Sequence, residues 1–413
     1  MLRSLLLLLI VVFSQKAASA QTSRPVLLVP DRVFDGVSGV PHAGWKVLIE
    51  GDRIVAAGPD VAVPAGAEVV TLPGATLMPG LIDLHVHLFL HPYDETSWDD
   101  QVAKEPLALR TARAVAAARA TLAAGFTTVR DLGTEGAGDA DAGLKAAIDR
   151  GIVPGPRLLI AGRALVATGS YGPKGFNGTV PQGAEEASGF DLPTAVRRQI
   201  GAGADWIKLY ADYRWGPGEL SRPTYTVEEL TLAVRVARDA GRKVAMHAST
   251  PEGMRRATAA GADTIEHGND GTAAEFAAMK AKGVALCPTL AASDATMRYA
   301  GRSADTLAPK RASFAAALRS GVVLCVGGDT GVFTHGQNAR EIALMAEWGL
   351  GLPRALIAAT SGNAAILGLG DRIGTLKAGM LADLVAVTGD PTRDAGALGR
   401  VVAVFKGGQR VAP

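Results

Sequence analysis

The middle of the chain, from about residue 79 to residue 368, alternates short apolar runs with alanine-rich stretches that have a helical pattern. This alternation is typical of strand and helix units on a parallel sheet. Eight runs qualify as strands, at residues 82–87, 127–131, 157–160, 206–210, 244–247, 264–267, 284–288 and 322–327. Eight parallel strands connected by helices close on themselves, so the pattern predicts an α/β protein with a (β/α)8 TIM-like barrel.

The two ends of the chain have a different pattern, with short strands joined by tight turns. In residues 21–78, Gly51 and Asp52 separate two alternating runs, which is a hairpin signal. Residues 369–413 contain further runs of the same kind. We therefore expect the two ends to pair as a small β-sandwich beside a barrel formed by residues 79–368.

Residues 1–20 have the features of a signal peptide. Arg3 precedes an apolar run at residues 5–13, and Ala18, Ser19 and Ala20 form a small-residue cleavage site. The run is shorter than the roughly 20 residues that a stable membrane anchor requires. We expect cleavage after Ala20, export to the periplasm or the medium, and no membrane association of the mature chain.

Cleavage would also remove the net charge. The whole chain has 42 Lys and Arg against 40 Asp and Glu, and residues 1–20 contain two of the basic residues, Arg3 and Lys16, and no acidic one. A neutral mature chain has no electrostatic signature of nucleic-acid binding. The expected partner is a small-molecule or dipeptide substrate, and we also expect a homo-oligomer.

The chain has two cysteines, Cys287 and Cys325. Each lies in an apolar, strand-like run. An oxidising compartment permits a disulfide, but the apolar surroundings favour buried free thiols.

Four of the seven histidines lie in or at the ends of predicted strands. His85 and His87 alternate along the first strand, so both imidazoles point to one face and can bind one metal ion. His247 and His267 end the fifth and sixth strands. Because barrel enzymes build their active sites at the C-terminal ends of the strands, the four histidines together predict metal binding.

Asp329 and Lys208 complete the predicted site. Asp329 follows two glycines after the eighth strand, where a carboxylate can bind a metal and also accept a proton. Lys208 lies within an apolar strand, where a charged ammonium is costly. Either its side chain extends to the end of the strand, or its neutral amine has reacted with carbon dioxide to form a carbamate that can bridge two cations.

This ordered set of residues resembles the amidohydrolase superfamily. The similarity spans nearly all of residues 25–413, including residues 371–385, whose sequence is typical of the C-terminal part of that family. Residues 125–133, 156–159 and 335–338 are similar to the imidazolonepropionase-like and prolidase-like branch. That branch also includes amidases acting on ochratoxin-type N-acyl amino acids.

The resemblance implies a site for two divalent metal ions, and zinc is favoured because the ligands are rich in histidine. His85, His87 and Asp329 would bind the more buried ion, and His247 and His267 the more exposed one. N6-carboxylated Lys208 would bridge the two ions. Asp329 would also act as the catalytic base.

Substrate contacts are expected from the loops after the strands. Where many relatives have a histidine after the third strand, this chain has Tyr171, so the role of that histidine is lost or transferred to Tyr171. Arg214, with Tyr213 or Tyr210, follows the lysine strand and can bind a substrate carboxylate, although these aromatic residues can equally pack on a neighbour. His335, after the eighth strand, could contact substrate or hold its own loop.

Together with these residues, the resemblance implies an exported, metal-dependent hydrolase of C–N bonds. The expected reaction releases a C-terminal amino acid from a dipeptide or an N-acyl amino acid. A cyclic-amide hydrolase of the imidazolonepropionase type is one alternative, although a signal peptide fits poorly with intracellular histidine breakdown. A periplasmic metal-binding protein without catalysis is the other, and a general base at Asp329 argues against it.

Overall fold

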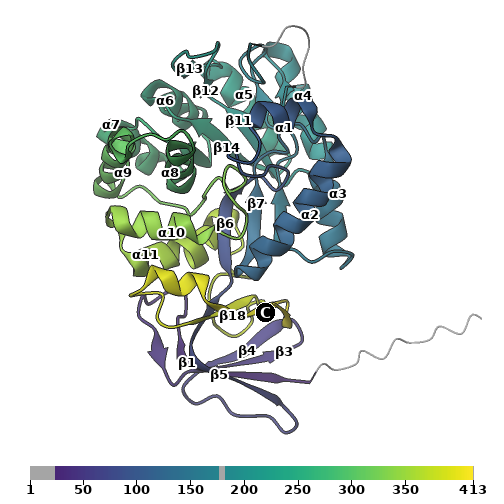
Figure 1. The fold of residues 1–413 in the computed structure, drawn as a ribbon, viewed down its shortest axis with the longest axis vertical. Helices are drawn as coiled ribbons and strands as arrows, with labels where there is room; N and C mark the ends of the chain where they lie inside the picture. Colours follow the sequence, from purple (N-terminus) through teal and green to yellow (C-terminus); the bar gives the residue numbers. More distant parts are fainter. Residues whose placement is uncertain (1–23, 176–181, 413) are drawn as a thin grey trace, which may run out of the picture.

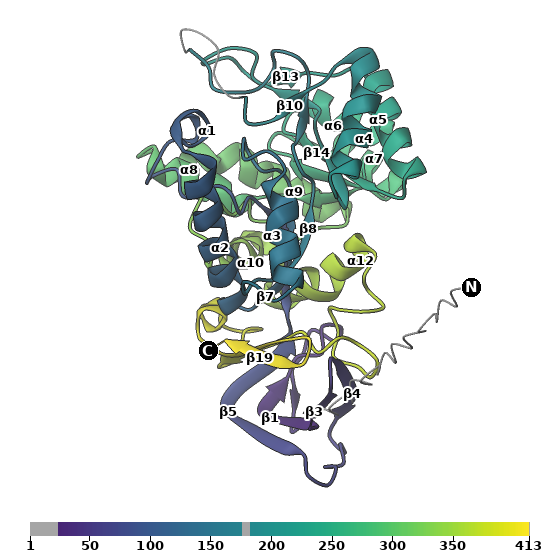
Figure 2. The same cartoon turned by 90° about the vertical axis from the view of Figure 1, so that its right-hand side faces the viewer.

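The computed structural model of the chain describes residues 24–175 and 182–412. They form a barrel surrounded by helices, with a smaller β-sheet domain attached at one end (Figures 1 and 2). The signal peptide predicted for residues 1–20 and its cleavage site lie outside the described residues. Among the helices of these two ranges, none is both long and apolar enough to cross a membrane.

The smaller domain is an eight-stranded sheet built from both ends of the chain. The strand β5 (Glu68–Pro79) pairs in antiparallel register with β17 (Leu384–Thr388), which joins the two ends. The other strands are β1 (Val26–Val33), β2 (His42–Ala43), β3 (Lys46–Glu50), β4 (Arg53–Gly58), β18 (Val401–Lys406) and β19 (Gln409–Ala412). Their order is β19-β18-β17-β5-β1-β3-β4, and β2 pairs with β1. The predicted pairing of the two chain ends with each other beside the barrel, expected as a small β-sandwich, is confirmed.

Seven parallel strands form most of the barrel wall. They are β6 (Leu81–Val86), β7 (Phe126–Asp131), β8 (Arg157–Ile160), β11 (Trp206–Tyr210), β14 (Lys243–Ala248), β15 (Thr264–His267) and β16 (Ala285–Cys287). Four of them, β6, β7, β11 and β16, are buried along their whole length. This is expected of parallel strands that have helices on one face and the barrel interior on the other.

The barrel wall continues from β8 to β11 through irregular pairing. The short strand β9 (Leu165–Val166) pairs with β11 and with β10 (Glu185–Glu186). In addition, the amide of Asp205 donates to the carbonyl of Ile160 at the end of β8. A small hairpin, β12 (Asp212–Tyr213) with β13 (Arg222–Pro223), follows β11.

The eighth strand predicted at residues 322–327 is not a regular strand, and this part of the prediction is wrong. The segment still closes the barrel, because Leu324 bridges Leu286 of β16 and the amide of Leu84 donates to the carbonyl of Val326. Regular pairing is interrupted where the side chain of Asn363 accepts from the Val326 amide and donates to its carbonyl. A side chain thus replaces part of the ladder, and the (β/α)8 barrel is confirmed.

Helices cover the outside of the barrel (Figure 1). Those that follow the first five strands are α1 (Trp98–Lys104), α2 (Leu107–Ala123), α3 (Ala140–Asp149), α4 (Leu192–Gly201), α5 (Val227–Asp239) and α6 (Pro251–Ala260). The later ones are α7 (Ala273–Lys282), α8 (Leu290–Tyr299), α9 (Ala308–Ser320), α10 (Ala339–Met345), α11 (Leu352–Ile357) and α12 (Asn363–Leu367). Capping boxes begin α5 at Thr226 and α7 at Thr272, since each threonine and the glutamate three residues later cap each other's backbone amides.

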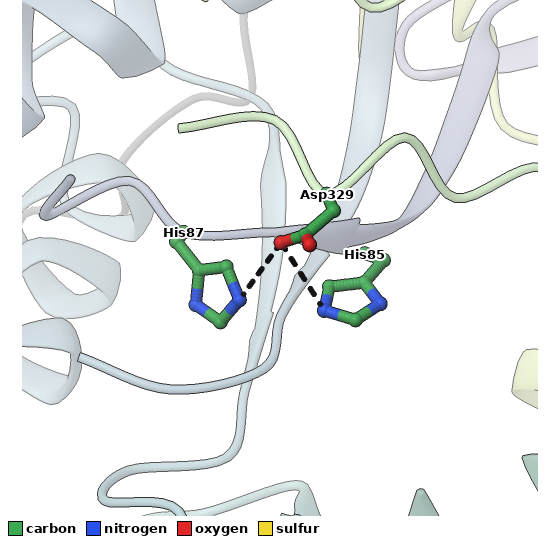
Figure 3. Close-up of side chains that lie close together, drawn as sticks. All are labelled: His85, His87 and Asp329. Atoms are coloured by element: carbon green, nitrogen blue, oxygen red, sulfur yellow. Dashed lines mark ion pairs between the residues drawn. The ribbon is translucent and has the colours of Figure 1, made fainter. Parts of the chain in front are cut away.

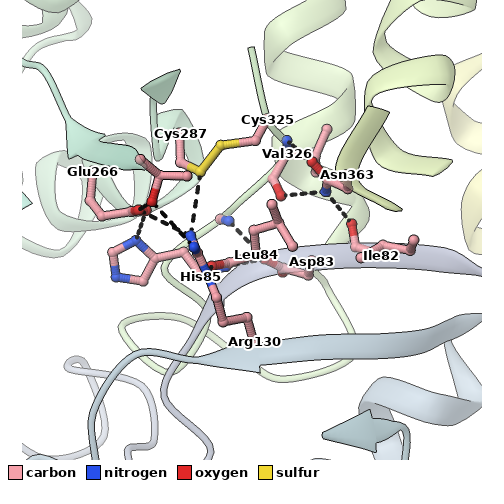
Figure 4. The surroundings of a disulfide bond; sticks show 12 residues. Ile82, Asp83, Leu84, His85, Arg130, Glu266, Cys287, Cys325, Val326 and Asn363 are labelled. Atoms are coloured by element: carbon pink, nitrogen blue, oxygen red, sulfur yellow. Dashed lines mark hydrogen bonds and ion pairs between the residues drawn. A yellow bond between two sulfur atoms is a disulfide. The ribbon is translucent and has the colours of Figure 1, made fainter. Parts of the chain in front are cut away.

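Cys287 and Cys325 form a disulfide, so the prediction of free thiols is wrong (Figure 4). The preceding residues, Leu286 and Leu324, bridge each other in parallel register. The two cysteines are therefore direct neighbours across the wall, and their Cα atoms are 4.8 Å apart. That distance lies within the range in which a disulfide forms without backbone movement.

Candidate active site

His85 and His87 project from the C-terminal end of β6, and each uses one ring nitrogen for a structural contact. The Nδ1 atom of His85 lies 2.9 Å from Oε2 of Glu266, and Nδ1 of His87 lies 2.8 Å from the carbonyl oxygen of Gly133. Both contacts fix the orientation of the ring. They leave Nε2 of each histidine available as a metal ligand.

Asp329 faces these two Nε2 atoms (Figure 3). Its Oδ1 lies 3.5 Å from Nε2 of His85 and 3.2 Å from Nε2 of His87. One ligand atom from each of the three residues lies within 4.8 Å of the others, which makes them a candidate metal-binding group. The predicted trio is therefore brought together.

The two glycines before Asp329 let this segment approach β6 closely. A Cβ atom on Gly327 would lie 2.9 Å from Cβ of His85, too close for any side chain at this position. Asp83 holds the same region together, because it accepts hydrogen bonds from the amides of His85 and Gly328 and from the side chain of Asn338. The segment that carries Asp329 is thereby fixed against the end of β6.

His247 and His267 lie beside this trio. The ring of His267 is 5.3 Å from that of His85, and 4.4 Å from that of His247. Nδ1 of His267 lies 2.8 Å from the Thr289 hydroxyl, and Nε2 of His247 lies 3.5 Å from Asp212. Each imidazole again keeps one nitrogen free, so all four predicted histidines gather in one place.

Burial sets the protonation of these histidines. It lowers the pKa of His85 to about 4, and lowers the pKa of His247 and His267 well below the usual value. A neutral imidazole is the form that binds metal ions. At His87 burial acts in the same direction, but Asp329 offsets it and raises the pKa to about 9. Burial alone would raise the pKa of Asp329, yet the nearby imidazoles hold it below its usual value, so this carboxylate is ionised.

Lys208 lies within β11 and is buried, with 1% of its surface exposed. Its Nζ atom accepts and donates no hydrogen bond among the described residues. Burial lowers the pKa of this amine to about 8. The lysine therefore does not extend to solvent, and its amine lies unpaired near the aspartate and the histidines.

A buried ion pair between Arg130 and Glu266 contacts the candidate metal ligand His85 (Figure 4). Oε1 of Glu266 accepts from the Arg130 guanidinium at 3.0 Å, while Oε2 contacts His85. Arg130 also donates to the carbonyl of Leu84 and lies 4.3 Å from the Trp206 ring. Asp131, next to Arg130 in the sequence, accepts hydrogen bonds from the backbone amides of Leu88 and Gly133. Glu266 was missed.

A cavity of about 450 Å3 opens over these residues. Four non-glycine residues of the described chain have positive φ, and all four line this cavity: Glu135, His267, Thr289 and Asp329. Such backbone conformations are costly for residues with a side chain, and they concentrate at functional sites. The strain supports this cavity as the candidate active site of the barrel.

The predicted substrate-binding residues divide into two groups. Tyr171, Tyr210, Tyr213 and Arg214 all line the cavity. His335 is not part of its wall, and its Nε2 lies 3.0 Å from the carbonyl of Leu90, so it holds a loop. Glu135, which was not among the residues expected from the sequence, also lines the cavity.

Comparison with known proteins identifies relatives over most of the chain. An uncharacterized protein of Mycobacterium tuberculosis is 30% identical over 364 residues, which cover 84% of this chain and 88% of that protein. Ochratoxinase of Aspergillus niger is 28% identical, covering 81% of this chain and 75% of the enzyme. The structure of a Xaa-Pro dipeptidase with methionine bound in its active site matches with a TM-score of 0.83 and 30% identity, over 94% and 99% of the two chains.

These relatives confirm the branch that the sequence motifs indicated, and they make the chain a hydrolase of C–N bonds. The model of the amidohydrolase family matches residues 76–411, from the last residues of β5 to the last residues of β19. The match includes every candidate metal ligand. The chain belongs to the amidohydrolase family.

Proposed function

We propose that this protein is an exported amidohydrolase with two metal ions that releases a C-terminal amino acid from a dipeptide or an N-acyl amino acid. The proposal rests on the set of residues that line one cavity. His85, His87 and Asp329 converge there within 4.8 Å, and the same cavity wall carries Arg214 with four tyrosines, three of which, Tyr171, Tyr210 and Tyr213, were expected from the sequence. A hydrolytic centre and a candidate carboxylate-binding group therefore face the same space.

The residues fit a pair of divalent ions. His85, His87 and Asp329 would hold the more buried ion, and His247 and His267 the more exposed one, because each histidine keeps a free ring nitrogen. Zinc is favoured by this nitrogen-rich set. When bound, the ions would polarise the scissile carbonyl and make a water molecule more acidic.

Lys208 fits the role of a bridging ligand after carboxylation. Its amine is buried without a partner, and burial favours the neutral form, which is the form that attacks carbon dioxide. Attack of the nitrogen lone pair on the carbon forms the N–C bond, and loss of one proton from nitrogen leaves a carbamate anion. That anion would give the site another oxygen-bearing ligand.

Asp329 is positioned to move the proton in hydrolysis. Its Oδ1 faces the two imidazoles, which leaves Oδ2 to accept a proton from the attacking water. The same oxygen would then deliver the proton to the leaving amine. The backbone hydrogen bond from the Asp329 amide to the His85 carbonyl, at 2.8 Å, keeps the base in place during both transfers.

Arg214 provides selectivity for substrates with a free carboxylate. It is exposed at the rim of the cavity, with its guanidinium carbon 5.5 Å from the Tyr213 ring. A guanidinium binds a carboxylate through two parallel hydrogen bonds, and the Tyr213 or Tyr210 hydroxyl can add another. The relatives support this class of substrate, since one is named a Xaa-Pro dipeptidase and has methionine in its active site.

The test is a screen of dipeptides and N-acyl amino acids, each as the free acid and as the C-terminal amide, with metal-reconstituted protein. Arg214→Ala should lower kcat/KM on acids by roughly tenfold to a hundredfold and have little effect on amides. Arg222→Ala is the matched control, because Arg222 is exposed on the same hairpin, opposite Tyr213, and does not line the cavity. Equal losses on acids and amides would show that Arg214 does not bind the carboxylate.

Export is the part of the proposal that depends on residues 1–20. A buried disulfide supports it, because such bonds persist mainly in oxidising compartments. N-terminal sequencing of the protein from its native host should find a chain beginning at Gln21. Light scattering of the same material would test the expected homo-oligomer.

A further inference from the structure

Glu135 is a buried acidic residue in the wall of the cavity that has no role in the proposed hydrolysis. It follows β7, its φ is 50°, and 2% of its surface is exposed. A buried carboxylate in a strained backbone conformation is costly unless other interactions compensate it. The position therefore calls for a functional explanation.

The two oxygens of Glu135 have different surroundings. Oε2 accepts hydrogen bonds from the Tyr171 hydroxyl at 2.7 Å and from Nε1 of Trp98 at 3.0 Å. Oε1 is buried and has no hydrogen-bond partner in the described part of the chain. The carboxylate is thus held firmly by one oxygen, and the other is left with unused acceptor capacity.

The buried arginine beside Glu135 does not pair with this carboxylate. The Arg110 guanidinium donates hydrogen bonds to three backbone carbonyl oxygens. They are those of Glu135 at 2.7 Å, Thr134 at 3.1 Å and Phe89 at 2.9 Å. These bonds fix the backbone at Glu135. They leave the carboxylate of Glu135, a residue of the cavity wall, without an arginine partner.

Aromatic rings surround the same part of the cavity. The Tyr171 ring centroid lies 4.7 Å from both the Tyr210 and the Tyr213 centroids, and 5.2 Å from that of Trp98. The faces of such rings attract cations, and they do so more strongly where water is excluded. An unpaired carboxylate oxygen beside clustered aromatic rings is a chemical environment suited to a positive charge.

We propose that Glu135, with Tyr171, Tyr210 and Tyr213, forms a subsite for a positively charged group of the substrate, an ammonium or a guanidinium. The inference rests on the proposed function, in which Arg214 of the same wall binds the substrate carboxylate. The subsite selects substrates that carry both charges. Two parts of a substrate can supply the cation: the N-terminal ammonium of a dipeptide, or the basic side chain of its C-terminal residue.

Two pairs of compounds separate these sources. Glycyl-L-phenylalanine and N-glycolyl-L-phenylalanine differ by an ammonium against a hydroxyl at the N-terminus. Nα-acetyl-L-lysine and Nα-acetyl-L-norleucine differ by a cation at the C-terminal side chain. We expect the charged member of one pair to have kcat/KM at least about tenfold above its neutral partner, which is the effect of one charged hydrogen bond.

Glu135→Gln is the decisive variant, because glutamine can still accept from Tyr171 and Trp98 but carries no charge. In this variant, kcat/KM of the charged compound should lie within about threefold of kcat/KM of its neutral partner. The value for the neutral partner should be almost unchanged from wild type. Glu105→Gln removes the same charge from a residue that contacts His91 and does not line the cavity, so it should leave the ratio as it is. A wild-type ratio near unity in both pairs, or equal losses on both members in Glu135→Gln, would overturn the inference.

Calorimetric binding of the same four compounds separates this inference from the proposed function. Binding is measured on Asp329→Asn, which lacks the proposed base, after its metal content has been matched to that of wild type, because Asp329 is also a proposed metal ligand. This variant should bind the charged member of the pair more tightly, and the double variant with Glu135→Gln should lose that preference. If wild type cleaves none of the four compounds but this binding pattern holds, the proposed reaction fails and the subsite stands. If the compounds are cleaved but charged and neutral members bind alike, the subsite fails alone.

Discussion

Nδ1 of His85 and Oε2 of Glu266 lie 2.9 Å apart, and both side chains are almost completely buried. The glutamate connects the candidate metal ligand on β6 to Arg130 on β7, since its other oxygen accepts from that guanidinium. Glu266 keeps an ionised carboxylate, because burial raises its pKa but Arg130 and His85 more than offset this and lower it to about 2. A charged acceptor at Nδ1 makes Nε2 a stronger ligand.

Glu266→Gln should therefore weaken metal binding by roughly tenfold to a hundredfold, because the imidazole loses its charged partner and Arg130 loses its counter-ion. The measurement is the metal content after equilibration with chelators of graded affinity. Glu185→Gln is the control, since Glu185 is also buried and paired with an arginine, Arg198, but does not line the cavity. Unchanged metal affinity in Glu266→Gln would show that this contact only supports packing.

Lys208→Ala should abolish turnover and recover part of it in the presence of formate, acetate or propionate. Each of these acids can place a carboxylate where the carbamate would lie, in the space left by the buried side chain. The same acids should give wild-type protein no increase in rate. A metal-loaded crystal with electron density for an unmodified amine at Nζ would contradict the bridging role.

The fold could be predicted because its signals are local and repeated. The alternation of strand and helix patterns predicted the barrel, and the turn signal near Gly51 helped to predict the β-rich ends. The eighth strand was misjudged because an apolar run does not reveal that the Asn363 side chain bonds to the backbone of Val326. The disulfide was missed for a related reason, since pairing of Cys287 with Cys325 depends on their register across the wall.

The candidate metal site could be predicted because its residues stand at strand ends, whose convergence the barrel guarantees. The residues behind it were harder to identify. Arg130 and Glu266 give the same signal that identified Lys208, a charge inside a strand that is otherwise apolar, but their mutual pairing spans 136 residues. Glu135 follows a strand within a loop, and no local pattern shows that its Oε1 atom has no partner.

Replacing both Cys287 and Cys325 with alanine should lower the free energy of unfolding by up to about 4 kcal/mol, the loop-closure entropy for a separation of 38 residues. Denaturant unfolding of the metal-loaded proteins measures the change. Both sulfurs are fully buried, so reductant added to the folded wild-type protein should have little effect. Two titratable thiols in wild type unfolded without reductant would show that the bond is not formed in solution.

Glu341 lies on α10 with none of its surface exposed. One of its oxygens accepts from the Ala291 amide at 2.7 Å, and the other has no partner among the described residues. Burial raises the pKa of this carboxyl to about 8, from 4.5 in an unfolded chain. Between those two values the folded protein retains a proton that the unfolded chain has released.

Stability should therefore fall as pH rises from about 5 to 8, by up to about 1.4 kcal/mol for each pH unit from this group alone. Glu341→Gln keeps an acceptor for the Ala291 amide and has no proton to lose, so its stability relative to wild type should increase over the same range. Glu347→Gln, at an exposed glutamate just beyond the end of α10, is the control and should show no such trend. Parallel curves of unfolding free energy against pH for wild type and Glu341→Gln would show that the Glu341 carboxyl titrates alike in the folded and unfolded chains.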